Sequence, residues 1–131
     1  MDVNYLGVIA CGISAFLLGG LWYSPALFGK IWQRQIGLSD EALNSGNKAV
    51  IFGGAFVLAL AAAYVFAMFL GPKPGLMLAV GAGFAAGLFW VATSFGINYL
   101  FERKSLSLFA INGSYHTLQF TLYGLILGLW S

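Results

Sequence analysis

The chain alternates between long apolar tracts and short polar connections. A helix needs about 20 mostly apolar residues to cross a hydrocarbon core about 30 Å thick. A soluble bundle would need a charged stripe on each helix instead, and none of the apolar tracts contains Asp, Glu, Lys or Arg. The pattern predicts an all-α membrane protein with four transmembrane helices in a single domain, residues 1–131. The four expected spans are Val3–Tyr23, Ala49–Leu70, Gly75–Leu100 and Leu106–Trp130.

The longest connection, residues 24–48, predicts an amphipathic helix that lies in the membrane interface. Ser24 is a suitable cap for it and Pro25 a suitable first residue. Gly37 is expected to end this helix, and Ser39 to cap a second short one. Aromatic residues are expected to anchor this region at the interface. They are Trp22, Tyr23, Phe28 and Trp32.

The same region carries a distinctive run of glycine, aromatic and proline residues. The run is Gly19-Gly20-Leu21-Trp22-Tyr23-Ser24-Pro25, followed by Leu27-Phe28-Gly29-Lys30 and Trp32. It resembles the signature of a family of small, mostly bacterial membrane proteins with four spans and a domain-of-unknown-function label. The resemblance implies a fold and a membrane location for most of the chain, and it brings no catalytic residues with it.

Composition and charge agree with a membrane location. Hydrophobic residues make up 60% of the chain and charged residues 8%, against about 45–50% and about 25% in soluble domains. The first and third connections hold five basic residues and the second holds only Lys73. Because basic loops stay in the cytoplasm, both termini are expected on the non-cytoplasmic side of the cell (inner) membrane. The net charge of +2 is explained by this topology and does not indicate nucleic-acid binding.

One face of the fourth tract is polar. Asn112, His116, Gln119 and Tyr123 are spaced by four, three and four residues, which places them along one side of a helix. His116 lies eleven residues after Ser105, or about 16 Å into the bilayer. Burying an unpaired polar group costs roughly 2–7 kcal/mol, so this stripe is expected to face protein or a wet cavity.

The third tract offers hydrogen-bond partners at matching depths. Folding the third connection back on itself places Ser94 opposite Asn112 and Trp90 opposite His116, with Asn98 nearby. We expect Trp90 or Ser94 to hydrogen-bond the stripe. Two interpretations stay open: the stripe holds helices together, or it lines a polar path or solute-binding site in which His116 titrates near neutral pH.

Small residues recur every fourth position in the tracts, which lets helix backbones approach closely. These rows could join copies of the chain into a homo-oligomer or pack within one chain, and the sequence leaves both open. The rows are Gly7, Cys11, Ala15 and Gly19; Ala55, Ala59, Ala63 and Ala67; Gly75, Ala79, Gly83 and Gly87; and Gly124 with Gly128.

Most chemistries lack the residues they need. The tracts hold only His116 and Cys11 as candidate metal ligands, whereas metal sites use several. Ser114 falls on another helix face from His116, so a serine nucleophile with its base is not expected. We therefore expect no enzyme activity, cofactor or metal. Two function classes follow: a structural or accessory subunit in the lipid bilayer, or a small oligomeric channel or transporter for a neutral or weakly charged solute.

Overall fold

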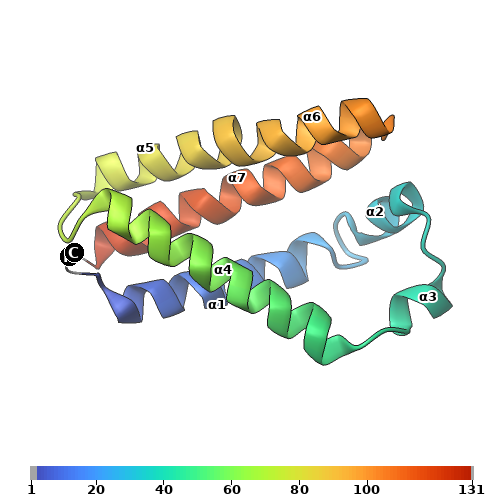
Figure 1. Ribbon diagram of the computed structural model, residues 1–131, viewed down its shortest axis with the longest axis horizontal. Helices are drawn as coiled ribbons and strands as arrows, with labels where there is room; N and C mark the ends of the chain where they lie inside the picture. The colour runs from blue at the N-terminus through green and yellow to red at the C-terminus, as the bar shows by residue number, and fades with distance from the viewer. Residues whose placement is uncertain (1–2, 131) are drawn as a thin grey trace.

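The computed structural model describes residues 3–130, and every regular element in that range is helical (Figure 1). Two short helices, α2 (Gly29–Ile36) and α3 (Asp40–Asn44), lie between the first two long ones. The four long stretches are α1 (Tyr5–Trp22), α4 (Lys48–Leu70), the continuous run of α5 (Leu76–Ala86), η1 (Gly87–Ala92) and α6 (Thr93–Glu102), and α7 (Leu106–Leu129). The middle segment of the third stretch, η1, is a π-helix.

Three of these stretches are long and apolar enough to cross a membrane by length and composition. They are α1, α4 and the run Leu76–Glu102, with mean hydropathies of 1.8, 2.3 and 1.9. The prediction of an all-helical protein is thus confirmed for the described residues, and three of the helices are candidate membrane spans. Helix α7 has 24 residues, but it is not among the three because it carries the polar side chains of the stripe.

Helix α7 lies at the centre of the molecule. It packs against α1 on one side and against α5 and η1 on the other, with further contacts to α2, α4 and α6. Figure 1 shows α7 running alongside the α5–α6 stretch, while α4 crosses the face of α1. Eight residues of α7 are buried, more than in any other helix.

Most of the small-residue rows are used inside the chain. A Cβ added to Gly83 would lie 2.1 Å from the carbonyl oxygen of Phe120, and one on Gly124 would lie 2.1 Å from that of Ala79. Helices α5 and α7 therefore meet backbone to backbone. On α1, Cys11 is fully buried against this centre. The buried members of these rows are in contact within one chain, whereas Ala55 and Gly75 are exposed.

The connection after α1 differs from its predicted form. Ser24 does not cap a helix; its hydroxyl donates to the carbonyl of Leu21 at 2.7 Å. Helix α2 begins only at Gly29, whose backbone is so close to Tyr23 that a Cβ there would lie 2.2 Å from the Tyr23 carbonyl oxygen. This tight turn leaves no room for a helix that begins at Pro25.

The ends of α2 and α3 match the sequence prediction. Gly37 terminates α2 in the left-handed conformation, with φ of 76°. Ser39 caps α3 by accepting a hydrogen bond from the backbone N–H of Ala42 at 3.1 Å. Glycine is favoured directly after a helix, as at Gly37, because it carries no Cβ. Serine is favoured directly before a helix, as at Ser39, because its oxygen satisfies a free helix N–H.

A hydrogen-bonded polar core as candidate functional site

The C-terminal half of the stripe, from His116 to Tyr123, is a chain of hydrogen bonds. The hydroxyl of Tyr123 donates to the carbonyl oxygen of Ala59 on α4 at 3.0 Å. Gln119 donates from Nε2 to the same hydroxyl at 2.7 Å, and its Oε1 lies 2.6 Å from Nδ1 of His116. Tyr123 is 0% exposed and Gln119 is 6% exposed. This half of the stripe is closed between helices.

The direction of these bonds fixes the tautomer of His116. A carbonyl oxygen only accepts, so Tyr123 must donate to Ala59 and accept from Gln119. The amide of Gln119 then presents its oxygen to the imidazole, so Nδ1 of His116 carries a hydrogen. In the neutral ring, Nε2 is left as a hydrogen-bond acceptor.

The N-terminal end of the stripe, at Asn112, joins three helices. Its Oδ1 accepts a hydrogen bond from the Tyr23 hydroxyl at 2.6 Å, and its Nδ2 donates to the Tyr99 hydroxyl at 2.7 Å. Beside it, the indole N–H of Trp22 donates to the carbonyl oxygen of Ile111 at 2.9 Å. The end of α1 and the last turns of α6 are thereby tied to the start of α7.

A second line of polar contacts joins α7 to α1. Tyr115 donates from its hydroxyl to the carbonyl oxygen of Ala15 at 2.8 Å, and the thiol of Cys11 lies 3.8 Å from the carbonyl oxygen of Tyr123. Among the described residues, no buried side-chain nitrogen or oxygen lacks a hydrogen-bond partner. Some of these bonds lie within α7, and those of Tyr123 to Ala59 and of Tyr115 to Ala15 join α7 to other helices.

The imidazole of His116 is half-buried among aromatic rings. It stacks on Phe95 at a centroid distance of 4.9 Å and meets Tyr115 edge-on at 4.8 Å. In the described part of the chain, Gln119 is the only hydrogen-bond partner of His116. The imidazole is thus partly buried, and neither of its nitrogens is both fully buried and without a partner.

The structure brings only part of the predicted set together. Asn112, His116, Gln119 and Tyr123 form the core described above. The expectation that Trp90 or Ser94 bonds to the stripe is wrong. Trp90 is 70% exposed, and Ser94 donates to the carbonyl oxygen of Trp90 in its own helix. Asn98 is exposed as well.

The expected bonds from Trp90 and Ser94 to the stripe are absent because two residues at equal depth in neighbouring helices need not point toward each other. The register also differs from the simple reflection about the third connection, which would place Gly87 opposite Gln119. A Cβ on Gly87 would lie 2.7 Å from Cα of Thr117, two residues earlier in α7. A π-helical turn accommodates one extra residue, and η1 contains this contact.

Sequence analysis did not group Phe95, Tyr99 and Tyr115 with the stripe. Phe95 and Tyr99 are spaced by four residues in α6, a signal for one shared helix face. Their ring centroids lie 5.7 Å apart. Tyr115 is adjacent to His116, and spacing alone gave no sign that it turns toward α1.

The predicted interfacial anchors have partners inside the protein. The ring centroids of Trp22 and Phe28 are 4.9 Å apart, and those of Tyr23 and Trp32 are 5.3 Å apart. Together with the hydrogen bonds of Trp22 and Tyr23, these ring contacts hold α2 against the C-terminal end of α1 and the N-terminal part of α7. The aromatic-belt interpretation did not include this role.

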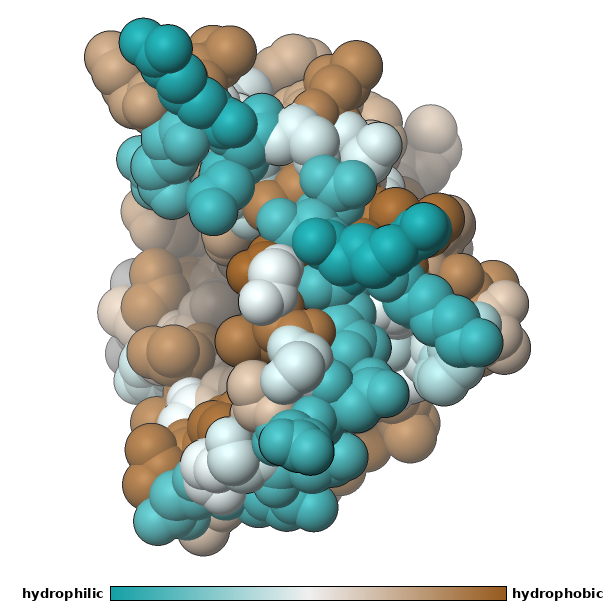
Figure 2. Space-filling model, turned by 90° about the vertical axis from the view of Figure 1, so that its right-hand side faces the viewer, coloured by the Kyte–Doolittle hydropathy of each residue, from teal (hydrophilic) through white to brown (hydrophobic). Residues whose placement is uncertain are grey.

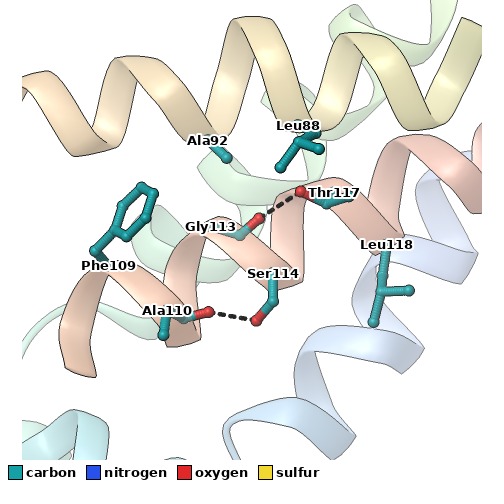
Figure 3. Close-up of a pocket in the computed structure, with 8 residues that line it drawn as sticks. All are labelled: Leu88, Ala92, Phe109, Ala110, Gly113, Ser114, Thr117 and Leu118. Carbon is teal, nitrogen blue, oxygen red and sulfur yellow. Dashed lines mark hydrogen bonds between the residues drawn. The ribbon is translucent and has the colours of Figure 1, made fainter. Parts of the chain in front are cut away.

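A separate groove of about 370 Å³ lies between η1 and α7 (Figure 3). It contains hydroxyl groups, but Thr117 donates to Gly113 and Ser114 donates to Ala110 in the same helix. Its walls are therefore apolar. The groove does not include the stripe residues, and it is lined by Leu88, Ala92, Phe109, Ala110, Gly113, Ser114, Thr117 and Leu118.

The described residues contain no group of three or more His, Cys, Asp or Glu side chains that could hold a metal ion. Ser114 hydrogen-bonds to backbone carbonyls of its own helix, whereas His116 bonds to Gln119. The arrangement shown here joins helices, and none of its hydrogen bonds pairs a nucleophile with a base.

These features define a helical protein with three helices apolar enough for a membrane and a hydrogen-bonded polar core around a fourth. The chain belongs to DUF1761, a family described as proteins of unknown function, which matches residues 6–128. Comparison with curated proteins and with solved structures gave no match. The family match confirms the resemblance at the level of a family of unknown function; the signature run and a bacterial distribution stay predictions.

Proposed function

We propose that this protein is a non-catalytic membrane protein with a structural or accessory role, either as a homo-oligomer or as a subunit of a larger assembly. The observation that carries the proposal is the continuous hydrogen bonding from His116 through Gln119 and Tyr123 to α4. Its members bond to one another, and among the described residues each buried side-chain nitrogen and oxygen has at least one hydrogen-bond partner within the protein. Such a core fixes how the helices meet.

In this proposal α7 is the fourth transmembrane helix. Its 24 residues correspond to about 36 Å of helix, enough to cross the bilayer. Its stripe faces neighbouring helices, which removes the cost of placing those groups against lipid. The chain then crosses the membrane four times, and the helices of the connection between α1 and α4 lie at the membrane surface.

Charge supports the orientation. The end of the molecule that holds α2, α3 and the end of α6 is rich in hydrophilic residues (Figure 2). By the preference of basic loops for the cytoplasm, this end faces the cytoplasm of a cell (inner) membrane, with both termini outside. The basic residues at this end are Lys30, Arg34, Lys48, Arg103 and Lys104. At the other end, the basic residue among those described is Lys73.

Cysteine labelling tests the closed core. Gln119→Cys in a Cys11→Ser background is treated in intact membranes with a small water-soluble thiol reagent. We expect labelling only after denaturation, because Gln119 is 6% exposed. Ser107→Cys, at an exposed position in the first turn of α7, is the matched control and should label readily. Rapid native labelling of Gln119→Cys would overturn the proposal.

The second candidate is a channel or transporter for a neutral or weakly charged solute. The observation in its favour is that the side chain of His116 is only partly buried, about 16 Å of helix from Ser105. Labelling of His116→Cys in the same background separates the two functions. Labelling at His116 without labelling at Gln119 indicates a crevice that ends at the core, whereas labelling at both positions indicates a water-filled path.

A further inference from the structure

A recess of about 550 Å³ lies between α2 and the segment that leads into α3. It opens on the hydrophilic end of the molecule seen in Figure 2. Gln33 closes its base by donating from Nε2 to the carbonyl oxygen of Leu38 at 3.1 Å and to Oδ1 of Asp40 at 2.8 Å. The segment is thereby folded back onto α2, and the side walls come from Lys30 and Arg34.

The recess has a cationic wall. Lys30 and Arg34 are four residues apart on α2, so their side chains lie on one helix face. Both are exposed, and neither has an ion-pair partner among the described residues. Asp40 is the one acidic side chain in the lining, which leaves two cations to one carboxylate. A guanidinium beside an ammonium is a donor set suited to phosphate oxygens.

The recess is held next to the place where α1 ends. Trp32, one turn along α2, packs on Tyr23 directly after α1. Apolar side chains flank the cations: Leu27 is 42% exposed, Ile31 37% and Leu38 41%. Since α1 is apolar enough to cross a membrane, its end lies at the level of lipid headgroups. Cations beside exposed apolar groups at that level match a phosphate attached to acyl chains.

We propose that the recess binds the phosphate of an anionic phospholipid, with Arg34 and Lys30 as donors and Leu38 against the lipid's apolar part. Asp40 lowers the affinity, because its carboxylate repels the phosphate. The proposal rests on the membrane location proposed above. It is independent of whether the polar core admits water, so labelling of Gln119 neither supports nor removes it.

The test measures lipid binding to the full-length protein by native mass spectrometry from detergent micelles, comparing phosphatidylglycerol with phosphatidylcholine. One basic residue near an anionic surface is worth about a fivefold change in binding. Lys30→Gln and Arg34→Gln should each weaken phosphatidylglycerol binding about fivefold, and the double variant about 25-fold. Binding of phosphatidylcholine should not change. Lys73→Gln, at the opposite end, is the matched control and should bind as the wild type does.

Asp40→Asn gives a test that misfolding cannot imitate, because it should strengthen phosphatidylglycerol binding. The asparagine oxygen can still accept the hydrogen bond from Gln33, so the shape of the recess is kept. Equal binding of phosphatidylglycerol by the wild type and the Lys30, Arg34 double variant would overturn the proposal. So would displacement of phosphatidylglycerol by millimolar inorganic phosphate, which would indicate a site for a free anion and not for a lipid.

Discussion

Gly83→Ala should loosen the packing of α5 on α7, and Gly81→Ala, two residues away on the same helix, should not. The added methyl at residue 83 would meet the carbonyl oxygen of Phe120 at 2.1 Å and Cα of Thr121 at 3.3 Å. At residue 81 a Cβ has no neighbour within 4 Å. The two variants make the same chemical change, and only one meets a backbone.

The size of the effect follows from this contact. Real Cβ atoms stay about 3.0 Å or more from such an atom, so α5 and α7 must separate by about 1 Å. Overpacking of this kind costs about 1–3 kcal/mol. Alanine regains up to about 1 kcal/mol over glycine in a helix, and this gain applies to both variants. Gly83→Ala should therefore lower the free energy of unfolding, whereas Gly81→Ala should leave it unchanged or raise it by up to about 1 kcal/mol.

The assay is reversible unfolding in mixed micelles with increasing dodecyl sulfate, followed by tryptophan fluorescence. Trp22 reports directly on the end of the bundle because it hydrogen-bonds to Ile111. If Gly83→Ala unfolded at the same dodecyl sulfate fraction as Gly81→Ala, the close approach of α5 and α7 would be refuted. The interior use of the small-residue rows would then lose its basis.

Two further changes test the polar core and the turn after α1. Tyr123→Phe removes a hydroxyl that bonds to both Ala59 and Gln119; leaving buried partners unpaired should cost about 1–3 kcal/mol in the same assay. The control Tyr64→Phe, on an exposed part of α4, should cost less than about 0.5 kcal/mol, and equal losses would contradict the core. Gly29→Ala places a Cβ 2.2 Å from the Tyr23 carbonyl oxygen and should destabilise by about 1–3 kcal/mol. Gly20→Ala, where nothing lies within 4 Å, should not, and a stable Gly29→Ala protein would show that the turn is not tight.

Local signals predicted the local structure well. The four apolar tracts correspond to the four long helical stretches within a few residues, and the left-handed Gly37 and the capping Ser39 lie where expected. These features depend on residues close in sequence. Local signals failed at Ser24. Its hydroxyl donates to the carbonyl oxygen of Leu21 and does not cap a helix, and α2 begins only after the tight turn at Gly29.

The spacing of the stripe was sufficient to group its four residues, but its partners depended on tertiary structure. Tyr23 and Asn112 are 89 positions apart, as are Trp22 and Ile111. Helical period gives the face on which a residue lies, and it does not say which helix covers that face. The pairing with Trp90 failed for this reason, since the reflection aligned positions along the two helices and did not constrain the directions of their side chains.

The order of the helices along the chain has a consequence for biogenesis. Helix α7, against which the other long helices pack, is synthesised after all of them. During translation α1, α4 and the α5–α6 stretch must wait with Gly83 and Gly87 uncovered, because their partner has not left the ribosome. When α7 emerges, it brings its hydrogen-bonding side chains to helices that have already been made. The contacts of α1 and of the α5–α6 stretch with α7 therefore form only after α7 has been synthesised.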